Sequence, residues 1–138
     1  HGLLRRQRQM CIRDSSSGGH FVHPTVFAKT NADMKLVKEE IFGPVVCAQP
    51  FSDESLEKIA EEANNTSFGL AASVWTKDIS TAHKLASKIR AGTVWVNCHN
   101  IFDASLPFGG YKESGWGREM GHEVLKNYTE VKAVTVNL

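Results

Sequence analysis

The sequence predicts an α/β fold in which parallel strands alternate with helices. Three short β-prone runs, 44–51, 70–76 and 93–97, are separated by two segments whose apolar residues recur with the period of a helix. Short connections between such elements favour a parallel sheet covered by helices. With 138 residues, 41% of them hydrophobic, the chain is long enough for one core.

The first strand and helix follow from the segment between Pro44 and Ser67. Residues 44–51, PVVCAQPF, form an apolar β-prone run, and Ser52 or Asp53 can cap the helix that follows. The inward stripe of that helix comprises Leu56, Ile59, Ala60 and Ala63. The polar run 64–67 is expected to end it.

The next strand, helix and strand repeat this pattern. Residues 70–76 form the strand, Asp78 caps the helix, and Gly92 is expected to end it in the C′ position. The residues predicted to face inward are Ile79, Ala82, Leu85, Ala86 and Ile89. Residues 93–97, TVWVN, form the third strand.

The last third of the sequence is richer in glycine and is expected to be less regular in structure. Residues 100–121 hold Pro107 and five of the eleven glycines, which predicts an irregular surface segment. A short helix is expected around 119–127. The β-prone residues 131–136 then predict a terminal strand.

The first twenty residues carry four arginines and one aspartate, a net charge of +3. They lack the apolar region of a secretory signal, and 15–19 reads as a flexible linker. A disordered or non-native leader is therefore favoured over a nucleic-acid-binding arm. We expect three parts: a leader over 1–17, a main part over 18–127 and a tail over 128–138.

Charge and hydropathy exclude several classes of partner. The net charge of the whole chain is +1, which gives no field to hold nucleic acid. No apolar run approaches the roughly 20 residues of a membrane span. Three widely spaced cysteines form neither a disulfide framework nor a metal knuckle, so a reducing, cytoplasmic location is expected.

Three patterns suggest chemistry only weakly. Cys98 and His99 could form a thiolate pair, but neighbours on a strand point to opposite faces. Cys47 is expected to be an inert core thiol, and His20 with His23 offers too few ligands for zinc. The glycines at 115, 117 and 121 fall one residue off a dinucleotide fingerprint and are better explained by tight turns.

The segment 39–44, EEIFGP, leaves two interpretations open. A carboxylate on this turn could accept hydrogen bonds from two ribose hydroxyls, while Phe42 faces a flat heterocycle. The alternative is an exposed acidic turn with a core phenylalanine. Spacing alone favours this alternative.

Five ordered segments together resemble the NAD(P)-dependent aldehyde dehydrogenases. They are KEEIFGPV (38–45), NNTSFGLAASVWTKD (64–78), AGTVWVNCHN (91–100), LPFGGYKESGWGRE (106–119) and NYTEVKAVTV (127–136). The resemblance covers about 18–138 and implies part of an aldehyde dehydrogenase catalytic domain with an oligomerisation strand at 128–138. It also implies oxidation of an aldehyde to a carboxylic acid with NAD or NADP, NAD being favoured.

The resemblance implies roles for five residues. Glu40 matches the glutamate that binds the nicotinamide-side ribose, and Phe42 the aromatic residue beside the nicotinamide. Asn100 and Phe102 match positions that line the aldehyde tunnel, and Phe108 matches a further pocket aromatic. The aromatic lining suggests an apolar aldehyde such as an arylacetaldehyde. The tail strand implies a homo-oligomer, a dimer or a tetramer.

Other family features have no match in the sequence. The nucleophilic cysteine in its Gly-Gln-x-Cys context, the general-base glutamate, the oxyanion-hole asparagine and the glycine-rich cofactor loop are all missing. We therefore expect no catalytic residue and no metal ligand in this sequence. We expect a C-terminal part of the enzyme that is inactive alone. The alternative function is that of a non-enzymatic α/β binding module.

Overall fold

A computed structural model describes residues 21–52 and 55–138. The chain divides into two compact units at residues 52 and 53. Each unit is described by itself.

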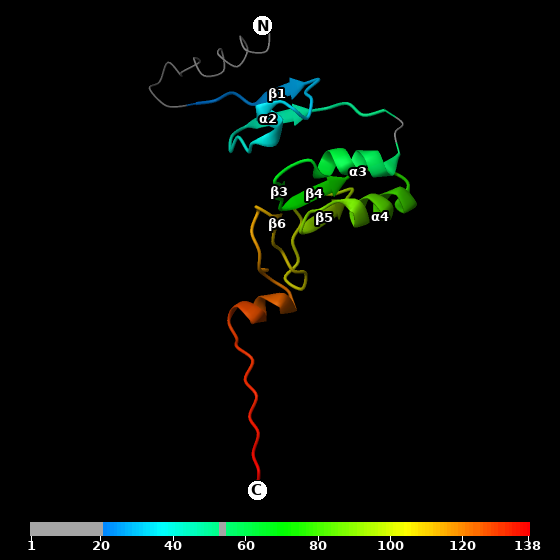
Figure 1. The fold of residues 1–138 in the computed structure, drawn as a ribbon. Helices are drawn as coiled ribbons and strands as arrows, with labels where there is room; N and C mark the ends of the chain where they lie inside the picture. Colours follow the sequence, from blue (N-terminus) through cyan, green and yellow to red (C-terminus); the bar gives the residue numbers. More distant parts are fainter. Residues whose placement is uncertain (1–20, 53–54) are drawn as a thin grey trace. The chain divides into compact units, whose positions relative to one another are not determined.

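The first unit contains one pair of parallel strands and a short helix (Figure 1). The elements are β1 (Thr25–Ala28), α2 (Lys35–Lys38) and β2 (Val45–Ala48). Strands β1 and β2 pair in register from Thr25 opposite Val45 to Ala28 opposite Ala48. The sequence analysis missed β1, although its residues, TVFA, are β-prone. Strand β2 is shorter than the predicted run and exposes Val46 on one face.

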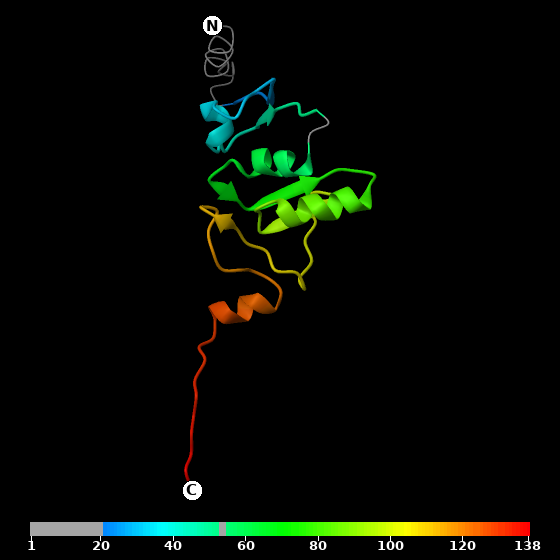
Figure 2. The same ribbon diagram turned by 45° about the vertical axis from the view of Figure 1, so that its right-hand side comes forward.

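The second unit is built around a strand–helix–strand repeat. Its helices are α3 (Leu56–Asn64) and α4 (Ile79–Lys88), and its strands are β3 (Phe68–Gly69), β4 (Ala71–Val74), β5 (Thr93–Val96) and β6 (Tyr111–Lys112). Strands β4 and β5 are parallel, with α4 between them in sequence, which confirms the α/β prediction (Figures 1 and 2). Strands β3 and β6 are antiparallel.

The described strands pair in three two-stranded pieces, β1–β2, β3–β6 and β4–β5. Within the first unit, β2 has β1 as its parallel neighbour, which satisfies backbone groups of both strands. That the run at 44–51 lies in one sheet with the later strands stays a prediction.

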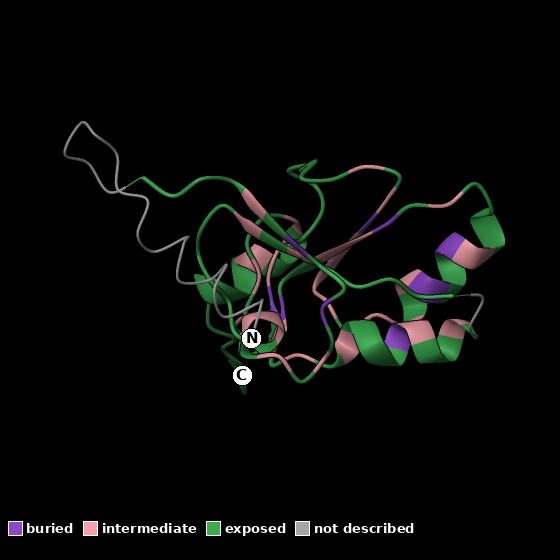
Figure 3. Ribbon diagram, turned by 90° about the horizontal axis from the view of Figure 1, so that it is seen from above, coloured by how far each residue is buried: buried purple, intermediate pink, exposed green. Residues whose placement is uncertain are grey.

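The core of the second unit lies where α3 and α4 meet β4 and β5 (Figure 3). Ala60, Val74 and Leu85 are buried there. Leu56, Ile59, Ile89 and Val94 pack against them. The prediction that Ala63 and Ile79 face inward is wrong. Both are exposed, since each lies in a terminal turn of its helix.

Helix boundaries correct two further predictions. The N-cap of α3 is Ser55, whose hydroxyl oxygen accepts a hydrogen bond from the Lys58 backbone N–H at 3.3 Å, so Ser52 does not cap this helix. The other predicted cap, Asp53, lies outside the described residues. Asp78 caps α4 as predicted. Gly92 is not the C′ residue, because α4 ends at Lys88. Its N–H instead donates to the Gly69 carbonyl at 3.0 Å.

The C-terminal region contains one 3₁₀ helix, η1 (His122–Asn127), in place of the predicted helix over 119–127. Residues 131–136 belong to none of the strands among the described residues, and Val131 and Val134 are exposed. An unpaired β-prone segment leaves its backbone groups to water or to a partner. Its use as a subunit contact stays a prediction.

Candidate functional site

Glu40 and Phe42 lie on an exposed turn between α2 and β2. The turn is tight, because the Val45 N–H donates to the Gly43 carbonyl at 2.7 Å. Phe42 has a φ of 48°, and the residue is 88% exposed. A bulky residue rarely adopts a left-handed conformation, and such residues concentrate at functional sites. The interpretation of Phe42 as a core residue is therefore wrong.

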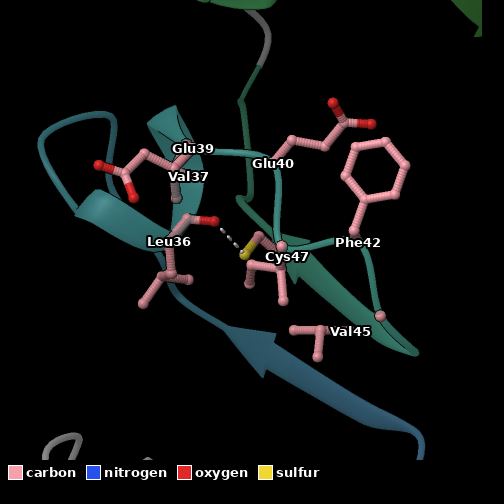
Figure 4. A pocket seen from close by; sticks show the side chains of 9 residues that line it. Leu36, Val37, Glu39, Glu40, Phe42, Val45 and Cys47 are labelled. Atoms are coloured by element: carbon pink, nitrogen blue, oxygen red, sulfur yellow. Dashed lines mark hydrogen bonds between the residues drawn. The ribbon is translucent and has the colours of Figure 1, made fainter.

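An open pocket of about 460 Å³ adjoins this turn. Its lining includes Leu36, Val37, Glu39, Glu40, Ile41, Phe42, Gly43, Val45 and Cys47. Figure 4 shows the side chains of Glu40 and Phe42 close together, with Glu39 pointing away from them. The Glu39 carboxylate pairs with the Lys35 ammonium at 3.5 Å, whereas Glu40 makes no ion pair or hydrogen bond with other described residues.

Cys47 lines the same pocket from β2. Its thiol donates a hydrogen bond to the Leu36 carbonyl at 3.3 Å (Figure 4), and burial raises the pKa of the Cys47 thiol. A thiol held in its protonated form is a poor nucleophile. The structure supports the prediction of an inert cysteine, although the side chain is half-buried rather than in the core.

Phe102 and Phe108 come together in the second unit. Their rings meet edge to face, with centroids 5.0 Å apart and planes at 85°. The Trp95 ring contacts Phe102 in the same way, with centroids 5.7 Å apart, and so extends the cluster. The sequence analysis missed Trp95 as a site residue, because its position in the run TVWV indicated only a strand. Asn100 lies on the loop that leads to Phe102 and is exposed.

Cys98 and His99 follow β5 rather than belonging to it. The argument that a strand sends their side chains to opposite faces is therefore wrong for these residues. The two side chains nevertheless do not pair, as expected. His99 Nδ1 lies 2.8 Å from the Ser73 hydroxyl oxygen, and no hydrogen bond joins His99 to Cys98 within residues 55–138.

Tight turns explain the glycines at 115, 117 and 121. Their φ angles are 103°, 85° and 57°, a region that glycine adopts without strain. No described set of three His, Cys, Asp or Glu side chains could hold a metal ion, and His20 lies outside the described residues. None of the helices in 21–52 and 55–138 has the length and apolar character needed to cross a bilayer.

The five predicted residues fall into two sets. Glu40 and Phe42 belong to the first unit, and Asn100, Phe102 and Phe108 belong to the second. Each set presents a surface suited to an organic ligand: a carboxylate with no partner among the described residues beside an exposed ring, and an amide beside an aromatic cluster.

Comparison with known proteins decides the family. The model of the aldehyde dehydrogenase family matches residues 6–134. The chain belongs to the aldehyde dehydrogenase family. Its match to the family model begins at residue 6, inside the segment predicted to be a leader, which lies outside the described residues.

Individual relatives agree with this assignment. The DhaS protein of Bacillus subtilis (strain 168) is 57% identical over 120 residues, which is 87% of this chain and 24% of that protein. A Bacillus cereus aldehyde dehydrogenase, solved as an NAD⁺ complex, is 58% identical with a TM-score of 0.81, over 87% of this chain and 24% of that one.

A third relative is the indole-3-acetaldehyde dehydrogenase AldA of P. syringae, solved with NAD⁺ and IAA. It is 44% identical with a TM-score of 0.81, over 88% of this chain and 24% of that one. The chain therefore spans about a quarter of the length of the aldehyde dehydrogenases that it matches.

Proposed function

We propose that this chain works as the C-terminal part of an aldehyde dehydrogenase that oxidises an aldehyde to a carboxylic acid with NAD or NADP. The observation that carries the proposal is its 58% identity and common fold with an enzyme solved as an NAD⁺ complex. No observation favours a non-enzymatic binding module. The longer protein that contains this chain is called the full-length enzyme below.

The turn at Glu40 and Phe42 is suited to the cofactor. A carboxylate with no partner among the described residues can accept hydrogen bonds from both hydroxyls of a ribose. The exposed Phe42 ring offers a flat face to a heterocycle. The cofactor supplies the acceptor for the hydride of the aldehyde. We favour NAD over NADP, and the relatives solved with NAD⁺ support this choice.

The aromatic cluster is suited to the substrate. Asn100, Phe102 and Phe108 are proposed to line the path of the aldehyde, and the two rings offer an apolar wall. This wall favours an apolar aldehyde such as an arylacetaldehyde. The name of the P. syringae relative, an indole-3-acetaldehyde dehydrogenase, is consistent with that class.

The chain alone is proposed to lack turnover. The described cysteines are Cys47, whose thiol donates a hydrogen bond to a carbonyl, and Cys98, which makes no hydrogen bond with the His99 imidazole among the described residues. Neither is placed to be activated as a nucleophile. Both thiols are free, which fits a cytoplasmic enzyme. The full-length enzyme is further proposed to be a dimer or a tetramer, with 131–136 contacting a neighbouring subunit.

The test compares NADH formation by the full-length enzyme and by the chain alone, with benzaldehyde, phenylacetaldehyde and acetaldehyde as substrates. We expect turnover only by the full-length enzyme and a lower KM for the aromatic aldehydes. A full-length enzyme that oxidises no aldehyde contradicts the proposal. Turnover by the chain alone that Cys98→Ser abolishes would make Cys98 the nucleophile.

A further inference from the structure

The loop after β5 carries Asn100 and Phe102 and has an unusual backbone. Asn97 and Asn100 both have left-handed conformations, with φ angles of 53° and 57°. Asparagine adopts this conformation more readily than other non-glycine residues, so these two positions let the chain turn sharply within the loop. The contacts of this loop determine how it presents Asn100 and Phe102.

Both ends of the loop are anchored by hydrogen bonds. The Asn97 carboxamide donates to the Thr76 carbonyl at 2.8 Å and accepts from the Thr76 N–H at 2.9 Å. At the far end the Trp95 indole N–H donates to the Ile101 carbonyl at 2.7 Å. These bonds hold the loop at residues 97 and 101. The residues between them need a further contact to hold them in place.

His99 supplies that contact. Its Nδ1 lies 2.8 Å from the Ser73 hydroxyl oxygen, and its ring meets the Trp95 ring edge to face at 5.2 Å. Ser73 and Trp95 are direct neighbours across β4 and β5. One imidazole thus joins both strands to the centre of the loop, next to Asn100.

The hydroxyl group of Ser73 is suited to holding His99, and with it the loop, in place. Ser73 is half-buried in β4, and its hydroxyl is the one polar side-chain group of that otherwise apolar strand. His99 is the partner that the structure gives it. The Asn100 carboxamide, by contrast, makes no hydrogen bond with other described residues and stays available to a ligand.

We propose that Ser73 and His99 are positioning residues that hold the loop 97–102 so that Asn100 and Phe102 face the aldehyde. The inference rests on the proposed function, because it assigns those two residues to the substrate path. Without the Ser73–His99 bond the centre of the loop gains freedom, and binding of the aldehyde must then order it. The loss of ordering therefore weakens binding of the aldehyde and leaves binding of the cofactor unchanged.

The test measures KM and kcat of the full-length enzyme for the aldehyde and the cofactor. Ser73→Ala and His99→Phe are each expected to raise the aldehyde KM about fivefold, the effect of one lost hydrogen bond. The cofactor KM should not change. Ser73→Thr keeps the hydroxyl and should restore the aldehyde KM. The double variant Ser73→Ala/His99→Phe should be no worse than either single variant.

Ser87→Ala is the matched control, because it removes a serine hydroxyl whose one hydrogen bond among the described residues goes to the Lys84 carbonyl, on the exposed side of α4. A second measurement uses the chain alone: Ser73→Ala should shift the imidazole ¹⁵N resonances of His99. Unchanged resonances would show that the bond is absent and overturn the inference.

The kinetic outcomes separate the two proposals. A wild-type enzyme that oxidises aldehydes, with Ser73→Ala raising only the aldehyde KM, supports both. An active wild type whose aldehyde KM is unaffected by Ser73→Ala overturns the positioning role and leaves the proposed function standing. A wild type with no aldehyde turnover overturns the proposed function and, with it, the positioning role.

Discussion

Asn64 joins the ends of the two core helices, and replacing it should destabilise the second unit. It is the last residue of α3. Its carboxamide donates to the Lys88 carbonyl at 2.9 Å and accepts from the Arg90 N–H at 2.7 Å. The Lys88 carbonyl is one of the groups that the end of α4 leaves without a helical partner. One side chain therefore satisfies two backbone groups.

Asn64→Ala removes both hydrogen bonds at once. At about 1 kcal/mol for each, the expected loss is about 2 kcal/mol in the free energy of unfolding. For a unit of this size that corresponds to a fall in Tm of roughly 8–16 °C. Asn64→Asp keeps the acceptor for Arg90 but cannot donate to Lys88 when ionised, so it should also be destabilising. Urea unfolding of the chain, followed by tryptophan fluorescence, measures the free energy of unfolding of each variant, and a thermal melt with the same signal measures its Tm.

Asn65→Ala is the control, because Asn65 is the adjacent exposed C-cap residue and its side chain makes no hydrogen bond with described residues. Its effect should stay within about 0.5 kcal/mol. Equal losses for Asn64→Ala and Asn65→Ala, or no loss for Asn64→Ala, would refute the reasoning.

Two further predictions concern acid stability and association. The Thr81 hydroxyl, with the backbone N–H groups of Thr81 and Ser80, lowers the pKa of Asp78 below its ordinary value of 3.8, so its stabilising effect is complete above that value and is lost as the pH falls below it. Asp78→Asn, which keeps a capping oxygen but does not titrate, should therefore show a shallower loss of stability below pH 3.8 in acid titrations followed by circular dichroism; equal slopes would contradict this. Deletion of 130–138 from the full-length enzyme should lower its oligomeric mass in light scattering, and an unchanged mass would exclude the tail as a subunit contact.

The local elements of the second unit could be predicted from the sequence. The Asp78 cap and the apolar spacing of Ala82 and Leu85 are short-range signals, and α4 follows them closely. The start of α3 is harder to place from the sequence, because Ser52, Asp53 and Ser55 are all residue types that favour the N-cap position. The hydrogen bond from the Lys58 N–H identifies Ser55 as the cap.

The long-range features could not be predicted in this way. The partner of β2 is β1, about twenty residues earlier, and no local pattern specifies that pairing. Phe42 has a large apolar side chain, which sequence rules assign to the core, and its left-handed φ is one that a bulky residue rarely adopts, so no sequence rule predicts its exposed place on the turn. The bond between Ser73 and His99 joins positions 26 apart, which only the β4–β5 register brings together.

The site residues were found by the resemblance and not by spacing. Spacing favoured an exposed acidic turn with a core phenylalanine at 39–44, and the structure confirms the exposure but not the core position. The chemistry proposed for Glu40 is that its carboxylate accepts hydrogen bonds from the two ribose hydroxyls of the cofactor.

Single-turnover hydride transfer by Glu40→Gln tests that assignment most directly. Glu39→Gln in the full-length enzyme is the matched control, because it neutralises the adjacent carboxylate, which pairs with Lys35 and points away from Phe42. If Glu40 holds the ribose, Glu40→Gln slows hydride transfer by roughly ten- to a hundredfold through a misplaced nicotinamide, with Tm unchanged and Glu39→Gln near wild type. A normal hydride step in Glu40→Gln, with a large fall in Tm, would show that Glu40 serves the fold and contradict its place in the cofactor site.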